Sequence, residues 1–166
     1  SRGLGDVYKR QGLYNKETTE QLTDELLSED ENKYHAFLIL DVDCFKQIND
    51  IYGHAVGDIV LQKFGKLLKG TFREGDILGR IGGDEFGVIM KNIQTKDIAM
   101  KKAEELLAKT QAYKIDELKG NNISISIGIS TAPQDGDCYM DLYKRADQAL
   151  YQAKRSGKAR VCNYFS

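Results

Sequence analysis

The segment that most restricts the fold is a pair of short β-like runs joined by a glycine-rich turn. Residues 77–81 and 86–90 are rich in aliphatic side chains, and residues 82–85, Gly-Gly-Asp-Glu, separate them. Glycine adopts the positive φ angles of tight turns at little cost, so this pattern predicts a β-hairpin with an acidic pair at its tip. A sheet that contains a hairpin is antiparallel or mixed, which excludes a doubly wound parallel sheet.

Hydrophobic periodicity predicts further elements around the hairpin. Helices are expected over residues 17–27, 44–55, 58–70, 95–110 and 139–155, and strands over residues 36–40, 123–129 and 161–165. The resulting order of elements predicts an α+β fold in which helices flank a central mixed or antiparallel sheet.

Four of these elements carry more detailed expectations. Residues 36–40 are apolar at consecutive positions, which predicts a strand covered on both faces near the middle of the sheet. Residues 123–129 alternate isoleucine with serine or glycine, which predicts a half-buried strand, and residues 161–165 are expected to form an edge strand. Asp58 follows Gly57 and can cap the helix over residues 58–70.

Length and composition fit a single domain without a membrane span. The chain has 166 residues, with 24 Lys and Arg against 25 Asp and Glu. Its longest aliphatic and aromatic run, residues 36–40, is far shorter than the ~18 residues of a spanning helix. A net charge of −1 argues against binding a nucleic-acid polymer. Three scattered cysteines without metal-site spacing suit the reducing cytoplasm.

The first eleven residues are set apart from the domain. They show no clear hydrophobic period and resemble translated sequencing-adapter read-through. We hypothesise that residues 1–11 are not native, and we expect the domain to occupy residues 12–166.

Two acidic segments predict a cation site. Asp41 and Asp43 end the buried strand, and Asp84 and Glu85 lie at the hairpin tip. If the hairpin pairs with that strand, the two segments converge, and like charges there require water or a cation between them. Oxygen ligands without a histidine or cysteine cluster favour Mg²⁺ or Mn²⁺ over zinc. Either segment alone is ordinary surface chemistry, but together they are typical of palms that hold two divalent ions.

The hairpin turn also carries a family resemblance. Residues 82–86 read GGDEF, the motif of the GGDEF family of diguanylate cyclases. Other segments resemble family blocks in family order: residues 41–50 (DVDCFKQIND), 52–54, 57–58, 80–83, 126–129 and 146–154 (ADQALYQAK). The resemblance extends from Gly12 to about Val161.

The resemblance implies a palm-like nucleotidyl cyclase fold and the condensation of two GTP molecules into cyclic di-GMP with release of two pyrophosphates. By similarity, Asp41, the Val42 carbonyl and Asp84 hold Mg²⁺, or Mn²⁺, with two ions in each active site. Glu85 or Asp84 assists deprotonation of the ribose 3′-hydroxyl, and the residues leave open which acid is the base. Lys46 adds a cation near the transferring phosphoryl group.

The resemblance also implies a set of substrate contacts. The expected substrate-binding residues are Cys44, Phe45, Lys46, Asn49, His54, Asp58, Arg80, Lys154 and Lys158. Asn49 and Asp58 match positions that read the guanine edge, and Cys44 belongs to the loop whose backbone N–H groups wrap the phosphates. Lys158 replaces the usual arginine, which keeps the charge but loses the bidentate fork.

Arg73 and Asp76 form an R-x-x-D pattern that resembles the family's inhibitory product site. A surface ion pair is the ordinary alternative for such a short pattern. We expect product inhibition, with Arg73 contacting phosphate and base and Asp76 accepting hydrogen bonds from guanine.

Each family domain binds one GTP, so the reaction is expected to need a homodimer, and an N-terminal sensor or regulatory domain is expected in the parent protein. One alternative is an inactive member that binds GTP or cyclic di-GMP as a receptor or serves for dimerisation, although the retained acidic residues argue against it. Another keeps the palm but yields cyclic GMP-AMP or a mononucleotide ring as the product. We expect the domain in the cytoplasm; the sequence leaves open the input signal and whether the parent protein is anchored in a membrane.

Overall fold

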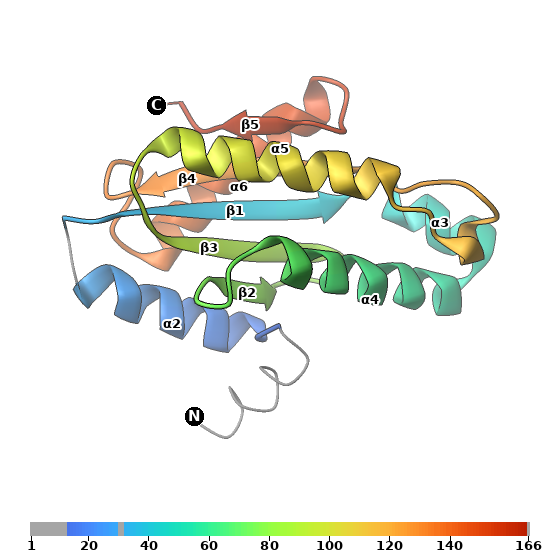
Figure 1. Ribbon diagram of the computed structural model, residues 1–166, viewed down its shortest axis with the longest axis horizontal. Helices are drawn as coiled ribbons and strands as arrows, with labels where there is room; N and C mark the ends of the chain where they lie inside the picture. The colour runs from blue at the N-terminus through green and yellow to red at the C-terminus, as the bar shows by residue number, and fades with distance from the viewer. Residues whose placement is uncertain (1–12, 30–31, 166) are drawn as a thin grey trace.

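The fold is a five-stranded mixed sheet with helices on both faces (Figure 1). The computed structural model describes residues 13–29 and 32–165, so the hypothesis about residues 1–11 lies outside the described residues. The helices are α2 (Lys16–Glu29), α3 (Phe45–Tyr52), α4 (His54–Thr71), α5 (Lys96–Ala112), the short 3₁₀ helix η1 (Asp116–Leu118) and α6 (Tyr139–Arg155). The strands are β1 (Tyr34–Val42), β2 (Ile77–Arg80), β3 (Glu85–Ile93), β4 (Ile125–Ala132) and β5 (Val161–Asn163).

The predicted hairpin is confirmed and sits beside the central strand. The strand order is β2-β3-β1-β4-β5, with β5 parallel to β4 and every other pairing antiparallel. In the register between β1 and β3, Asp41 lies directly opposite Glu85. The two acidic segments therefore converge at one end of the sheet, as expected from the sequence.

Alternating residues of β1 divide the core into two layers. Leu38 and Leu40 face the layer that α4 and α5 cover, whereas Phe37 and Ile39 face α6. In Figure 1, α4 and α5 cross the front of the sheet and α6 lies behind it. Because side chains two apart on a strand share a face, Asp41 belongs to the α6 side of the sheet.

The boundary between α3 and α4 corrects one expectation. Gly53, with φ of 92°, ends α3 and precedes α4, which begins at His54. Asp58 therefore lies inside α4 as an exposed residue, and the predicted N-cap role is wrong. The sequence argument allowed Gly53 to end the first helix but started the second helix only after Gly57, whereas α4 begins directly after the positive φ of Gly53.

Strand β4 corrects a second expectation, because it is buried at every position rather than on one face. A Cβ at Gly128 would lie 2.1 Å from the Ala146 carbonyl oxygen, so α6 rests directly on the strand backbone. The serines on this face are hydrogen-bonded: the Ser130 hydroxyl donates to the Leu142 carbonyl at 2.7 Å. A buried serine is tolerated when its hydroxyl is hydrogen-bonded within the protein. The alternation of isoleucine with serine or glycine therefore did not indicate a solvent-exposed face.

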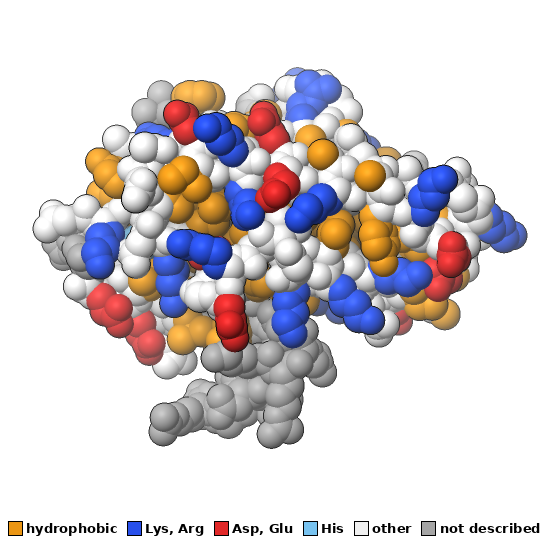
Figure 2. Space-filling model, viewed as in Figure 1, with side chains coloured by type: hydrophobic (Ala, Val, Ile, Leu, Met, Phe, Trp, Pro, Cys, Tyr) orange, Lys and Arg blue, Asp and Glu red, His pale blue; other side chains and the backbone are white. Residues whose placement is uncertain are grey.

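Across the described residues, no helix is both long enough and apolar enough to pass through a bilayer. Figure 2 shows basic side chains interspersed with acidic and apolar ones over the face that α4 and α5 form.

Candidate active site at the ends of β1 and β3

Three carboxyl groups meet where β1 ends and β3 begins. Asp41 and Glu85 are cross-strand partners, and Asp84 lies in the turn just before β3. The negative charge of Asp84 contributes to the raised pKa of Asp41, as expected for two carboxyl groups that lie near each other. The structure thus brings together the acidic residues that the sequence argument grouped.

Asp41 is a buried carboxylate in which only one of the two oxygens has a hydrogen-bond partner. Its Oδ2 accepts a hydrogen bond and ion pair from the Lys154 ammonium, while Oδ1 is buried and has no hydrogen-bond partner. Burial raises the pKa of Asp41 to about 6, with Lys154 opposing and Asp84 adding to the rise. Burial lowers the pKa of Lys154, but the Asp41 carboxylate outweighs burial and raises it overall. An unpartnered buried carboxylate oxygen is costly unless a ligand satisfies it.

We expect the metal-free protein to become less stable as the pH rises from about 4 to about 6 because of Asp41. Its pKa is raised from 3.8 in the unfolded chain to about 6 in the folded protein. Protonation of Asp41 therefore stabilises the fold fully at a pH below the unfolded-state pKa, and this stabilisation is lost as the pH rises through the folded-state pKa. The free energy of unfolding should fall by roughly 2–3 kcal/mol over this range. Urea unfolding with a chelator, in the wild type and in Asp41→Asn, measures this. Parallel pH profiles for the two proteins would contradict the expectation.

Glu85 is held by a residue that the sequence argument did not single out. The Tyr143 hydroxyl on α6 donates a hydrogen bond to Glu85 Oε1 at 2.7 Å. Burial raises the pKa of Glu85, the Tyr143 hydrogen bond opposes this rise, and Asp147 adds to it. Tyr143 and Lys154 are eleven residues apart, close to three helical turns, and this spacing in the predicted helix is the signal that could have identified them as a pair.

Asp43 has a structural role although it lies only two residues from Asp41. Its carboxylate accepts hydrogen bonds from the Ser126 hydroxyl at 2.6 Å, the Ser124 hydroxyl at 2.6 Å and the Ala159 N–H at 3.0 Å. These contacts tie the end of β1 to β4 and to the segment after α6. Its oxygens are therefore already occupied by donors within the protein.

The loop after β1 and the segment after α6 form a local basic surface. Cys44, in the left-handed conformation with φ of 56°, precedes α3, whose first N–H groups lack partners within the helix. Lys158 Nζ lies 3.2 Å from Cys44 Sγ, and Lys46, two residues after Cys44, is exposed. Phe45 differs from these residues because its side chain packs against the core. Backbone N–H groups and lysine ammonium groups are suitable donors to an anion.

The predicted guanine-reading residues lie at the junction of α3 and α4. The Asn49 carboxamide packs against Gly57, where an added Cβ would lie 1.9 Å from Asn49 Oδ1. Asp58 follows Gly57 and is exposed, and His54 is exposed one helical turn earlier on α4. Asn49 Oδ1 is buried without a hydrogen-bond partner, which leaves this amide able to bind a polar ligand.

Arg80 contacts the hairpin turn itself. Its Nε and terminal nitrogen both donate to the Gly83 carbonyl, at 3.0 and 2.6 Å. Its backbone N–H donates to the Tyr14 carbonyl at 2.9 Å, so Tyr14 extends the sheet beside β2. The Arg80 guanidinium therefore supports the turn that carries Asp84, and its expected contact with substrate stays a prediction.

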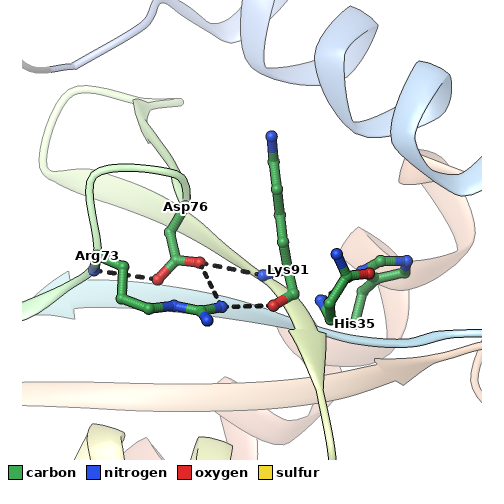
Figure 3. Close-up of polar contacts among 5 residues, drawn as sticks. His35, Arg73, Asp76 and Lys91 are labelled. Atoms are coloured by element: carbon green, nitrogen blue, oxygen red, sulfur yellow. Dashed lines mark hydrogen bonds and ion pairs between the residues drawn. The ribbon is translucent and has the colours of Figure 1, made fainter.

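Arg73 and Asp76 lie just before β2, at the end opposite to the hairpin turn. Figure 3 shows their contacts with each other and with Lys91. The buried Asp76 carboxylate accepts the backbone N–H groups of Arg73 and Lys91 at 3.2 and 3.1 Å, and the Arg73 guanidinium at 3.1 Å. The Arg73 side chain is 61% exposed and borders a cavity of about 580 Å³ that Lys101 and Lys102 also line. Asp76 is thus engaged within the protein. One terminal nitrogen of the Arg73 guanidinium also donates to Asp76 and to the Lys91 carbonyl, but the side chain is exposed enough to contact a ligand.

Taken with the sheet, this arrangement of acids and lysines defines the palm-like class of nucleotidyl cyclases. A family profile described as "Diguanylate cyclase, GGDEF domain" matches residues 11–160. Diguanylate cyclase A of Treponema denticola is 40% identical over 127 residues, which cover 76% of this chain and 34% of that relative. The response regulator PleD of Caulobacter vibrioides is also 40% identical over 127 residues, which cover 75% of this chain and 28% of that relative.

Solved structures agree with the sequence comparisons. The GGDEF domain of TpbB from Pseudomonas aeruginosa has a TM-score of 0.88 at 32% identity, covering 94% of this chain and 99% of that one. The active GGEEF domain of a diguanylate cyclase from Vibrio cholerae has a TM-score of 0.85 at 29% identity, covering 92% and 97%. The chain belongs to the GGDEF family of diguanylate cyclases. It spans about a third of the length of the curated relatives.

Proposed function

We propose that this domain condenses two GTP molecules into cyclic di-GMP and releases two pyrophosphates. The observation that carries the proposal is the meeting of Asp41, Asp84 and Glu85 at one end of the sheet, with Lys154 paired to Asp41. The same family in the comparisons includes named diguanylate cyclases, and one solved relative, DgcB from Caulobacter crescentus, was determined with cyclic di-GMP.

The acidic cluster fits a divalent cation. Asp41 Oδ1 is buried without a partner, and the nearby donors are hard oxygens, which suit Mg²⁺ or Mn²⁺. Asp41, the Val42 carbonyl and Asp84 are the residues that would hold two such ions. When bound, the ions supply charge that lowers the pKa of the attacking hydroxyl and neutralises the phosphates.

The residues of the chain bind and orient the substrate around this cluster. Lys46, Lys154 and Lys158, together with the N–H groups at the start of α3, are proposed to bind the triphosphate. Asn49 and Asp58 are proposed to pair with guanine, because an amide and a carboxylate match its N1, N2 and O6 groups.

The reaction requires two protomers that face each other, because each domain is proposed to bind one GTP. The curated relatives are longer than this chain, and PleD is named a response regulator, which supports a regulatory domain in the parent protein. We place the domain in the cytoplasm, where its three free cysteines stay reduced.

The test is incubation with GTP and Mg²⁺, with the chain either alone or fused to a constitutive dimeriser. Cyclic di-GMP resolved by chromatography is the expected product, and the fused form should be faster. Tight GTP binding without any product would instead identify a receptor. An equal rate with and without the dimeriser would contradict the two-protomer mechanism.

We further propose that cyclic di-GMP inhibits the enzyme through Arg73. Arg73→Ala should raise the product concentration for half-inhibition by at least about tenfold, because it removes an accessible guanidinium that can bind phosphate bidentately. The initial rate should stay within about twofold of the wild type, since Arg73 lies at the opposite end of β2 from the acidic cluster.

Arg73 is the informative position because Asp76 also has a structural role. Asp76→Ala would leave the N–H groups of Arg73 and Lys91 without their acceptor and so confound inhibition with instability. Lys109→Ala on α5 is the matched control for loss of an exposed positive charge. Unchanged inhibition in Arg73→Ala would exclude this site.

A further inference from the structure

We infer that Tyr143 is a positioning residue that fixes the Glu85 carboxylate in the active site. The inference rests on the proposed function, in which Glu85 is a candidate acceptor of the ribose 3′-hydroxyl proton. Its basis is the hydrogen bond from the Tyr143 hydroxyl to Glu85 Oε1 at 2.7 Å. A bond from a hydroxyl to a carboxylate of this length is in the strong, charge-assisted range.

The Tyr143 ring is held in place before any substrate arrives. It stacks on the Tyr139 ring with centroids 5.8 Å apart and meets the edge of Phe37 at 6.4 Å. Tyr139 is buried and itself packs against Phe37 at 5.4 Å. Aromatic rings packed in this way have few alternative rotamers, so the hydroxyl is a preorganised donor.

Helix α6 carries both the Tyr143 hydroxyl and the Lys154 ammonium group of the site. Tyr143 and Lys154 lie about 16 Å apart along the helix axis, at a spacing close to three turns, and therefore on one face. Tyr143 binds Glu85, and Lys154 binds Asp41, which is the cross-strand partner of Glu85. The two long side chains of one rigid helix thus hold both carboxyl groups from the same side of the sheet.

The hydrogen bond assigns different roles to the two oxygens of Glu85. Oε1 is occupied by the Tyr143 hydroxyl, which leaves Oε2 as the oxygen available to a ligand. Burial raises the pKa of the Tyr143 hydroxyl, and the Glu85 carboxylate adds to the rise, so the hydroxyl stays a donor at neutral pH. A glutamate side chain has three rotatable bonds, and one fixed oxygen removes most of this freedom.

Tyr143→Phe tests the inference because it deletes the hydroxyl and keeps the ring. We expect kcat for cyclic di-GMP synthesis to fall about tenfold, while KM for GTP stays within about twofold. The double variant Tyr143→Phe/Glu85→Gln should be no slower than Glu85→Gln alone, since Tyr143 acts through Glu85. Tyr151→Phe is the matched control, a tyrosine on the exposed part of the same helix.

Two kinetic results would overturn the inference. One is a kcat for Tyr143→Phe equal to that of Tyr151→Phe. The other is an additive loss in the double variant, because additivity means that Tyr143 and Glu85 act independently. If the first result were accompanied by a rise in KM, it would assign Tyr143 to substrate binding instead of positioning.

A structural measurement keeps the inference separate from the proposed activity. Crystal structures of the wild type and of Tyr143→Phe should be compared. In Tyr143→Phe, the Glu85 side chain should adopt a different rotamer or two alternate conformers. An unchanged Glu85 rotamer overturns the positioning role whether or not the domain acts on GTP. If the wild type makes no product, the proposed function fails, and the Glu85 rotamer alone decides the role of Tyr143.

Discussion

Asp41→Asn is expected to lower cyclic di-GMP synthesis by at least about 1,000-fold while the domain stays folded. Asparagine keeps the size of the side chain but replaces a negative oxygen at the centre of the proposed cation site. Loss of about 4 kcal/mol of charge stabilisation in the transition state corresponds to this factor. The measurement is the initial rate of pyrophosphate release with saturating GTP and Mg²⁺ in a forced dimer.

The same substitution is expected to cost little stability. Burial opposes the charge of Asp41, as its raised pKa of about 6 indicates, so a neutral side chain relieves an unfavourable desolvation. The released Lys154 side chain is 37% exposed and can reach water. In urea without metal, the free energy of unfolding should therefore stay within about 1 kcal/mol of the wild-type value.

Asp97→Asn is the matched control for Asp41→Asn. Asp97 is exposed in the first turn of α5, which follows the end of β3 remote from Glu85. The charge change is identical, but no effect on the rate is expected. A rate for Asp41→Asn within tenfold of this control would remove Asp41 from the catalytic centre.

The fold was largely predictable because its strongest signals are local. Glycines in the 82–85 turn and the apolar run at residues 36–40 specify a hairpin and a central strand without knowledge of distant contacts. Once those two elements pair, Asp41 and Glu85 must converge. The acidic part of the site was therefore accessible from sequence pattern alone.

The remaining features depend on tertiary contacts that no short pattern encodes. Gly128 brings α6 onto β4, and this contact buries serines that the alternation had placed on a solvated face. Tyr143 reaches Glu85 only because α6 packs against β4 and β1, the strand that pairs with β3, and a helical tyrosine by itself is typical of packing. The start of α4 directly after Gly53 was missed because Gly57, four residues later, gave an equivalent signal for a helix start.

The different roles of Asp41 and Asp43 were also beyond the sequence. Both follow the same buried strand, and strand geometry places both on the same side. Only the positions of Ser124, Ser126 and Ala159 show that one carboxylate is already satisfied. This difference leads to opposite expectations for the two residues.

Asp43→Ala is expected to destabilise the domain by about 2–4 kcal/mol. The substitution removes the acceptor of two serine hydroxyls and one backbone N–H, and Ser126 is fully buried, so its hydroxyl cannot turn to water. Buried donors that lose a charged acceptor bear the full cost of desolvation. Urea unfolding without metal measures the loss.

Comparison of the two aspartates separates function from stability. Asp41→Asn should abolish the rate and keep the fold, whereas Asp43→Ala should weaken the fold and keep a measurable rate at low temperature, where the folded fraction remains high. The effect of Asp43→Ala should arise from the loss of ties between β1, β4 and the segment after α6, because its carboxylate oxygens bind only protein donors among the described residues. A stability for Asp43→Ala within about 0.5 kcal/mol of the wild type would show that these hydrogen bonds contribute little. A rate as low as that of Asp41→Asn in the fully folded Asp43→Ala protein would place Asp43 in the catalytic centre as well.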